Sequence, residues 1–82
     1  MPTPEKILSL LSEITETEEV RRNPDLALYD LQILDSMRTV ELLIAVSRDL
    51  GIEISPAEFD RDAWATPQKF VDDILNRSAL SR

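Results

Sequence analysis

One serine, flanked by an acid and by apolar residues, is the best candidate for covalent chemistry in this 82-residue chain. The stretch Ile33-Leu34-Asp35-Ser36-Met37 places Ser36 where a long loop is expected to meet the start of a helix. A hydroxyl there is accessible and lies near the positive end of the helix dipole, which favours an attached phosphate. The chain has no His and no Lys near Ser36, so another protein would have to activate this hydroxyl. The alternative is that Ser36 serves only as a helix N-cap, a position at which Ser and Asp are preferred.

The composition excludes several other kinds of chemistry. The absence of Cys and His excludes a zinc finger, a thiolate nucleophile and an imidazole base, and we expect no metal site. The single glycine, Gly51, does not suffice for the glycine-rich loops that bind nucleotide phosphates. Sixteen acidic and nine basic residues give a net charge of −7, which disfavours nucleic-acid binding. We therefore expect no catalytic residue and no nucleic-acid partner.

The length allows a single domain over residues 1–82. The longest uninterrupted apolar stretch, Leu42–Val46, is far shorter than a membrane span. Residues 1–5 lack the basic and apolar segments of a signal peptide. Together with the lack of cysteine, these features favour a cytoplasmic protein.

Two long helices and a loop are expected to position Ser36. Thr3 and Pro4 indicate the start of a first helix over about residues 4–17. Residues 21–34 then form a long loop, which its apolar side chains hold against the core. The second helix begins at Asp35-Ser36 and ends at Gly51, where left-handed backbone is needed. Its apolar residues form a stripe that is typical of a core-facing side: Met37, Val40, Leu43, Ile44 and Leu50, widened by Leu42 and Val46.

Two further helices complete the predicted fold. The capping box Ser55-Pro56-Ala57-Glu58 predicts a short third helix, anchored in the core by Phe59. Thr66-Pro67 opens a fourth helix that frays from Asn76 onward, which leaves about residues 4–76 structured and 77–82 as a tail. The predicted fold class is therefore all-α, a small four-helix bundle with a long loop between its first two helices.

This layout resembles the acyl and peptidyl carrier proteins over nearly the whole chain. Those proteins carry 4′-phosphopantetheine on the serine of an Asp-Ser-Leu or Asp-Ser-Met motif, which Leu34-Asp35-Ser36-Met37 matches. The resemblance implies that a phosphopantetheinyl transferase attaches the group to Ser36 from coenzyme A. It also implies the four-helix fold of that family, with the reactive thiol supplied by the prosthetic arm.

A second resemblance is more specific. Asn23-Pro24-Asp25, Thr39–Leu43 and above all Glu58–Asp62 with Trp64 and Thr66-Pro67 are similar to the D-alanine-carrying branch of the family, which serves teichoic acid D-alanylation in bacteria. The resemblance implies a non-catalytic carrier that holds D-alanine as a thioester. A D-alanine–carrier protein ligase would load it, and membrane-bound acyltransferase machinery would pass the cargo to lipoteichoic acid. Gln32 departs from this pattern, because glycine usually stands there.

Two other interpretations remain open. A stand-alone aminoacyl or peptidyl carrier of a nonribosomal or secondary-metabolite pathway would keep Ser36 and change only the cargo. A helical adaptor without a prosthetic group would use Ser36 as a cap and the second helix to bind a partner helix. Treatment with coenzyme A and a phosphopantetheinyl transferase separates the adaptor from both carriers.

The residues beside Ser36 are the expected partner contacts. The four charges of the second helix cancel, unlike the strongly acidic second helix of fatty-acid carriers. Partners are therefore expected to contact Met37 and Val40, for which ordinary core packing is the alternative. By resemblance, Asp35 would lie near coenzyme A and metal in the complex with the transferase, and helix capping is its alternative role. We expect a monomer, because carriers meet several partners in turn.

Three residues near the fourth helix have structural interpretations. Trp64 and Phe59 are expected to anchor the core rather than to stack on a ligand. Arg61, set between Asp60 and Asp62, is expected to form a structural ion pair or to tether a loop.

Overall fold

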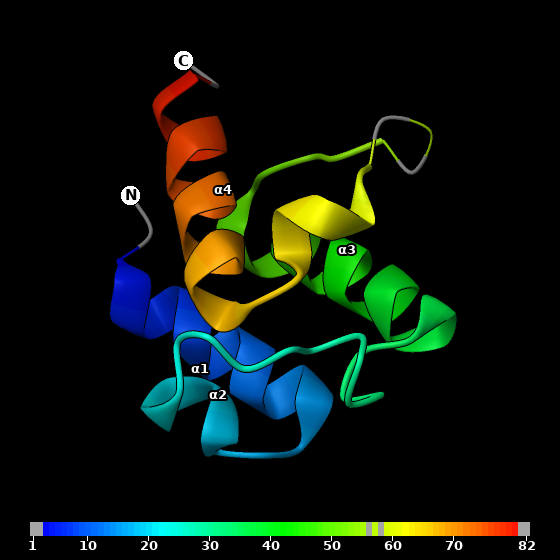
Figure 1. Cartoon of the computed structure of the whole chain (residues 1–82). Coiled ribbons are helices and arrows are strands. Elements are labelled where there is room, and N and C mark those ends of the chain that lie inside the picture. Colours follow the sequence, from blue (N-terminus) through cyan, green and yellow to red (C-terminus); the bar gives the residue numbers. More distant parts are fainter. Residues whose placement is uncertain (1–2, 56, 58, 81–82) are drawn as a thin grey trace.

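The computed structural model describes residues 3–55, 57 and 59–80, and this part of the chain is all-α (Figure 1). Within the described residues there is no strand and no helix with the length and apolar character needed to cross a membrane. The predicted all-α class and the long connection before the second long helix are confirmed. The elements are α1 (Pro4–Thr15), α2 (Glu19–Arg22), α3 (Ser36–Leu50), the 3₁₀ helix η1 (Arg61–Trp64) and α4 (Pro67–Leu80).

Helix α1 begins as its sequence predicts and ends slightly earlier. The Thr3 hydroxyl accepts a hydrogen bond from the Lys6 amide at 3.2 Å, and Pro4 occupies the first helical position. Glu16 then adopts left-handed backbone with φ of 58°, and its amide donates to the carbonyl of Ser12. The helix therefore stops at Thr15 rather than near residue 17.

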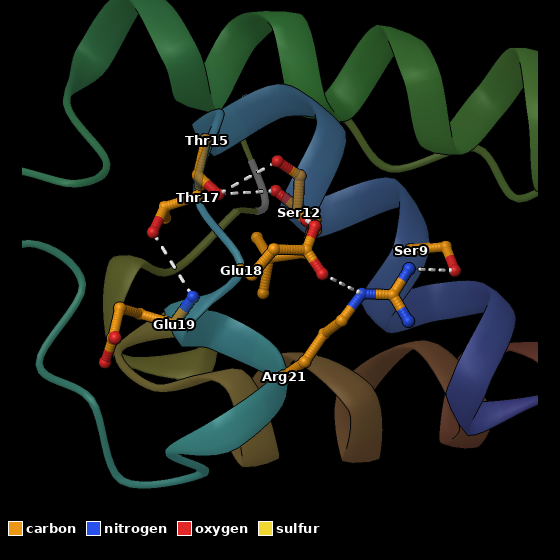
Figure 2. Close-up of polar contacts among 8 residues, drawn as sticks. Ser9, Ser12, Thr15, Thr17, Glu18, Glu19 and Arg21 are labelled. Atoms are coloured by element: carbon orange, nitrogen blue, oxygen red, sulfur yellow. Dashed lines mark hydrogen bonds and ion pairs between the residues drawn. The ribbon is translucent and has the colours of Figure 1, made fainter.

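Helix α2 was not predicted, because its four residues include one apolar side chain and so give no periodicity. That side chain, Val20, is buried in the core. Figure 2 shows how polar contacts hold α2 against α1. The Ser12 hydroxyl donates to Glu18 at 2.7 Å, the same carboxylate pairs with Arg21 at 3.1 Å, and Arg21 donates to the Ser9 hydroxyl at 2.7 Å.

Helix α3 has the predicted bounds, but only part of the predicted apolar stripe along it faces the core. Its buried residues are Thr39, Leu42, Leu43, Ala45 and Val46. Met37, Val40 and Ile44 are 74%, 53% and 58% exposed. Each residue advances an α-helix by about 100°, which puts these three on the side opposite the buried one. Apolar spacing marks both sides of this helix, and only one of them meets the core.

The short third helix lies later in the chain than the capping box predicted. Pro56 and Glu58 of that box are outside the described residues, and Ala57 lies in a turn with its amide donating to the Ser55 hydroxyl at 3.3 Å. The single helical turn is instead η1, which starts at Arg61. The cap of η1 is Asp60, whose carboxylate accepts from the Asp62 amide at 3.0 Å. This side-chain contact competes with a helix that begins before Asp60.

Aromatic packing joins η1 to α4. Trp64 is fully buried, with its ring centroid 4.7 Å from that of half-buried Phe59 and 4.7 Å from that of Phe70, both in edge-to-face geometry. The expectation that Trp64 and Phe59 are core anchors is confirmed. The indole N–H of Trp64 donates to Asp73 at 2.9 Å, so its one polar group is satisfied.

Helix α4 continues to Leu80, beyond Asn76, from which the sequence predicted fraying. Arg77 explains part of the extension, because its guanidinium pairs with Asp73 one turn earlier at 2.9 Å. The same Asp73 carboxylate is held by Trp64, which ties the second half of α4 to η1.

The long connection before α3 is fixed to the core by its leucines. Leu26, Leu28 and Leu34 are buried together with residues of α1, α3 and α4. This agrees with the prediction that the loop packs on the core. The segment leading to Ser36 is therefore a packed, defined stretch of chain.

Candidate functional site

Ser36 is the first residue of α3, and its side chain is exposed. The helix cap is the preceding residue, because Asp35 has extended backbone and its carboxylate accepts from the Arg38 amide at 2.8 Å. Within the described residues no hydrogen bond occupies the Ser36 hydroxyl. The interpretation of Ser36 as the N-cap is therefore wrong, and its hydroxyl is available at the corner of the fold.

The backbone before Ser36 is held by hydrogen bonds to Leu28. The amides of Ile33 and Leu34 both donate to the Leu28 carbonyl, at 2.8 and 3.0 Å. The Leu28 amide donates in turn to the carbonyl of Ala65 at 2.9 Å, which lies just after η1. The loop that presents Ser36 is thus closed on itself and tied to the second half of the chain.

Arg38 fixes the first turn of α3 to the end of α1. Its guanidinium donates to the carbonyls of Ile14 and Thr15 at 3.2 and 2.8 Å and lies 3.6 Å from the Glu16 carboxylate. Sequence reasoning did not identify this role. The signal was a cation in the first turn of a helix, where the dipole disfavours it, so that a compensating partner was to be expected.

Met37 and Val40 lie on the exposed side of α3 that begins beside Ser36. Their exposure rules out the alternative that they pack in the core. Ile44 continues this side, and an open groove borders it, lined by α3 residues and by residues 53–55. We call Met37, Val40 and Ile44 the apolar side of α3. Sequence reasoning placed Ile44 in the core and did not single out Leu31, an exposed leucine of the preceding loop.

The charges on α3 are largely neutralised by close partners. Arg38 pairs with Glu16, and Arg48 pairs with the adjacent Asp49 at 3.2 Å. Helix α3 therefore adds no net charge to the surface near Ser36, where the apolar side chains of Met37 and Val40 are exposed.

A phosphopantetheine group fits this arrangement. Attachment to the exposed hydroxyl of Ser36 would leave the Asp35 cap intact, and the phosphate would lie at the N-terminus of a 15-residue helix. The chain has no Cys, and the thiol of such a group would supply the nucleophile that its own residues lack.

Comparison with known proteins defines the class. Residues 5–74 match the family described as phosphopantetheine attachment site, and the chain belongs to this family of carrier proteins. The group that the family bears is 4′-phosphopantetheine, and the protein is a carrier rather than an enzyme. A carrier of this kind has two general classes of partner, a phosphopantetheinyl transferase and a ligase that loads it.

Similar proteins include several D-alanyl carrier proteins. The D-alanyl carrier protein of Listeria welshimeri is 51% identical over 67 residues, which cover 82% of this chain and 86% of that protein. Two D-alanyl carrier proteins of Listeria monocytogenes, from serotype 4b and serovar 1/2a strains, are 49% identical over the same shares.

Proposed function

We propose that this chain is a single carrier domain over residues 1–82 that holds D-alanine as a thioester on a 4′-phosphopantetheine arm attached to Ser36. The observation that carries the proposal is the exposed Ser36 hydroxyl at the start of α3, which has no hydrogen-bond partner in the described part of the chain, with the capping role taken by Asp35. The D-alanyl carrier proteins among the relatives support the cargo.

The chain contributes presentation and not catalysis. In the attachment reaction the Ser36 oxygen would form a phosphodiester with the pantetheine phosphate of coenzyme A, while the bond to the nucleotide phosphate breaks. The Ser36 proton would pass to a base on the transferase, because the chain has no His and the Asp35 carboxylate is engaged by the Arg38 amide. A tethered cargo then reaches successive partner sites at high effective concentration.

The apolar side of α3 supplies contacts for these partners. Met37 and Val40 project beside Ser36, and exposed aliphatic or Met side chains are suited to seating in a partner's pocket. Asp35 serves as the cap of α3 and additionally faces coenzyme A during attachment. The partners are the transferase, a D-alanine–carrier protein ligase and membrane-bound acyltransferase machinery that delivers D-alanine to teichoic acid. The carrier acts in the cytoplasm as a monomer.

The mass of the intact protein tests the attachment site. Wild type, Ser36→Ala and Ser55→Ala are incubated with coenzyme A and a phosphopantetheinyl transferase. Wild type and Ser55→Ala should each gain one phosphopantetheinyl group, since Ser55 is a second exposed serine that does not begin a helix. Ser36→Ala should gain none. An unchanged mass of the folded wild type would contradict the proposal and favour a helical adaptor.

A further inference from the structure

Arg61 contacts the ring of Tyr29 and not the carboxylates of its two acidic neighbours in the described part of the chain. Its guanidinium carbon lies 4.5 Å from the ring centroid of Tyr29, 32 residues earlier in the chain. Within the described residues Arg61 forms no ion pair with Asp60 or Asp62. The arrangement is a cation–π contact that joins the first turn of η1 to the loop before α3.

Tyr29 extends this contact to the residue before Ser36. The Tyr29 hydroxyl lies 2.7 Å from the hydroxyl of Thr39, and the Thr39 hydroxyl donates to the Asp35 carbonyl at 2.6 Å. Thr39 has one hydroxyl proton, and a carbonyl oxygen only accepts. The proton between Tyr29 and Thr39 must therefore come from Tyr29.

The backbone joins the same two segments a second time. The Leu28 amide donates to the Ala65 carbonyl at 2.9 Å, so consecutive loop residues contact both ends of the η1 segment. Thr39 is buried, Tyr29 is half-buried and Arg61 is exposed, so the relay is shielded from water only toward its Thr39 end. The route runs from Arg61 through Tyr29 and Thr39 to the Asp35 carbonyl, one peptide bond from Ser36.

We propose that Arg61 and Tyr29 are positioning residues for the covalent modification of Ser36. They hold Thr39, and through it the Asp35-Ser36 peptide, in the orientation in which the Ser36 hydroxyl is presented to the transferase. This inference rests on the proposed attachment at Ser36. It assigns a role to Arg61, which lies far from Ser36 in sequence and touches neither Ser36 nor Asp35 in the contacts of the described residues.

The test measures attachment kinetics with a phosphopantetheinyl transferase and coenzyme A. Arg61→Ala should lower the kcat/KM for the carrier about two- to fivefold, the range expected for losing an exposed cation–π contact. Tyr29→Phe keeps the ring but removes the hydroxyl, and should lower it about three- to tenfold. The KM for coenzyme A should not change. Arg61→Lys keeps the cation and should restore most of the rate.

A double variant separates positioning from general weakening of the fold. Once Tyr29→Phe has broken the hydroxyl relay, adding Arg61→Ala should cost little further rate. Arg22→Ala, which removes an exposed arginine of α2 with a 3.8 Å surface ion pair, is the matched control and should behave as wild type. All rates are taken well below the unfolding temperature of each variant.

The outcomes distinguish the two proposals. A wild type that takes up no phosphopantetheine defeats the proposed function itself. A wild type that is modified, with Arg61→Ala and Tyr29→Phe modified at the same rate, overturns the positioning role alone. Independent, multiplicative losses in the double variant would also overturn it, because two unlinked residues would give that result. Exchange of the Thr39 amide, which donates to the Asp35 carbonyl at 2.9 Å, should be faster in Arg61→Ala than in wild type.

Discussion

Gln32, three residues before Asp35, adopts backbone with φ of 60°. This left-handed region costs a residue with a side chain about 1–2 kcal/mol, and glycine enters it freely. The conformation is set by the closed loop around it, in which the Gln32 amide donates to the Tyr29 carbonyl at 3.0 Å. Gln32 therefore stands at a position where glycine is physically favoured, and this chain tolerates strain there.

Gln32→Gly should stabilise the protein. Relief of the strain, less the entropy that glycine adds to the unfolded chain, leaves a gain of about 0.5–1 kcal/mol in the free energy of unfolding. Urea denaturation measures it. The matched control is Gln68→Gly in α4, which should destabilise, because Gln68 is helical and donates to Asp72 at 2.9 Å. A loss of stability for Gln32→Gly would contradict the strain argument.

Asp35 allows capping to be separated from a role in attachment. Asp35→Ala removes the bond to the Arg38 amide and should cost about 1 kcal/mol of unfolding free energy. Asp35→Asn retains a good cap and should stay within about 0.5 kcal/mol of wild type. If the carboxylate also faces coenzyme A, Asp35→Asn should be modified more slowly despite normal stability. Equal modification rates would leave Asp35 a cap alone.

At the scale of the elements, α1 is the helix on which the others are assembled. It contacts α2, α3 and α4, and Arg38 joins the end of α1 to the start of α3. Two sets of hydrogen bonds therefore fix the first turn of α3: the Asp35 cap and the contacts of Arg38 with the end of α1. Both act within a few residues of Ser36.

Arg38→Ala should destabilise the junction of α1 and α3. It removes two charge-assisted hydrogen bonds from carbonyls at the end of α1, at a cost of about 1.5–3 kcal/mol in unfolding free energy. Arg48→Ala on the same helix is the matched control. Arg48 has an exposed pairing with Asp49, so its loss should cost less than about 0.5 kcal/mol. Thermal or urea unfolding of both variants decides whether the carbonyl contacts matter.

The elements also show how far sequence reasoning reaches. Helices α1 and α3 were predicted closely, because Thr3, Pro4, Asp35 and Gly51 are local signals that act within one turn. Helices α2 and η1 were not, since four-residue helices give no periodicity and depend on distant contacts such as Glu18 with Ser12. The side of α3 that faces the core depends on which helices α3 packs against. The spacing of apolar residues within α3 does not predict this.

The residues of the candidate site also differ in how well the sequence predicts them. Ser36, Asp35, Met37 and Val40 were found from a short contiguous motif, and the structure puts all four at one exposed corner. Arg38 and Tyr29 were missed, and Arg61 was expected to form an ion pair or to tether a loop, but without its partner. These roles arise from contacts between segments up to 32 residues apart. The residues expected to carry the chemistry can therefore be identified from a short stretch of sequence. The residues that hold them in position cannot, because they are distant in sequence.

At the scale of the whole molecule, the excess acidic residues lie outside α3, and the apolar side of α3 lies beside Ser36. The charges of α3 sum to zero, so the whole net charge of −7 comes from residues outside this helix. A partner can therefore approach the apolar side of α3 without meeting a strong local field. This arrangement suits a carrier that presents one attachment point to several partners.

The exposed residues of that corner should matter for binding and not for folding. Met37→Ser and Val40→Ser should change the free energy of unfolding by less than about 0.5 kcal/mol, because both side chains are mostly in water already. The KM of the loading ligase for the carrier should rise about tenfold, as expected when an apolar anchor worth about 1–2 kcal/mol is removed. An unchanged KM would place the ligase contact elsewhere.

Loading of the modified protein with D-alanine tests whether this chain is a D-alanine carrier. Wild type bearing phosphopantetheine and the Ser36→Ala variant are each incubated with the D-alanine ligase, ATP and either D-alanine or L-alanine, and intact mass is measured. We expect one alanyl addition on wild type with D-alanine, removable by hydroxylamine as a thioester is, and none on Ser36→Ala. A modified wild type that stays unloaded with D-alanine would contradict the role of this chain as a D-alanine carrier.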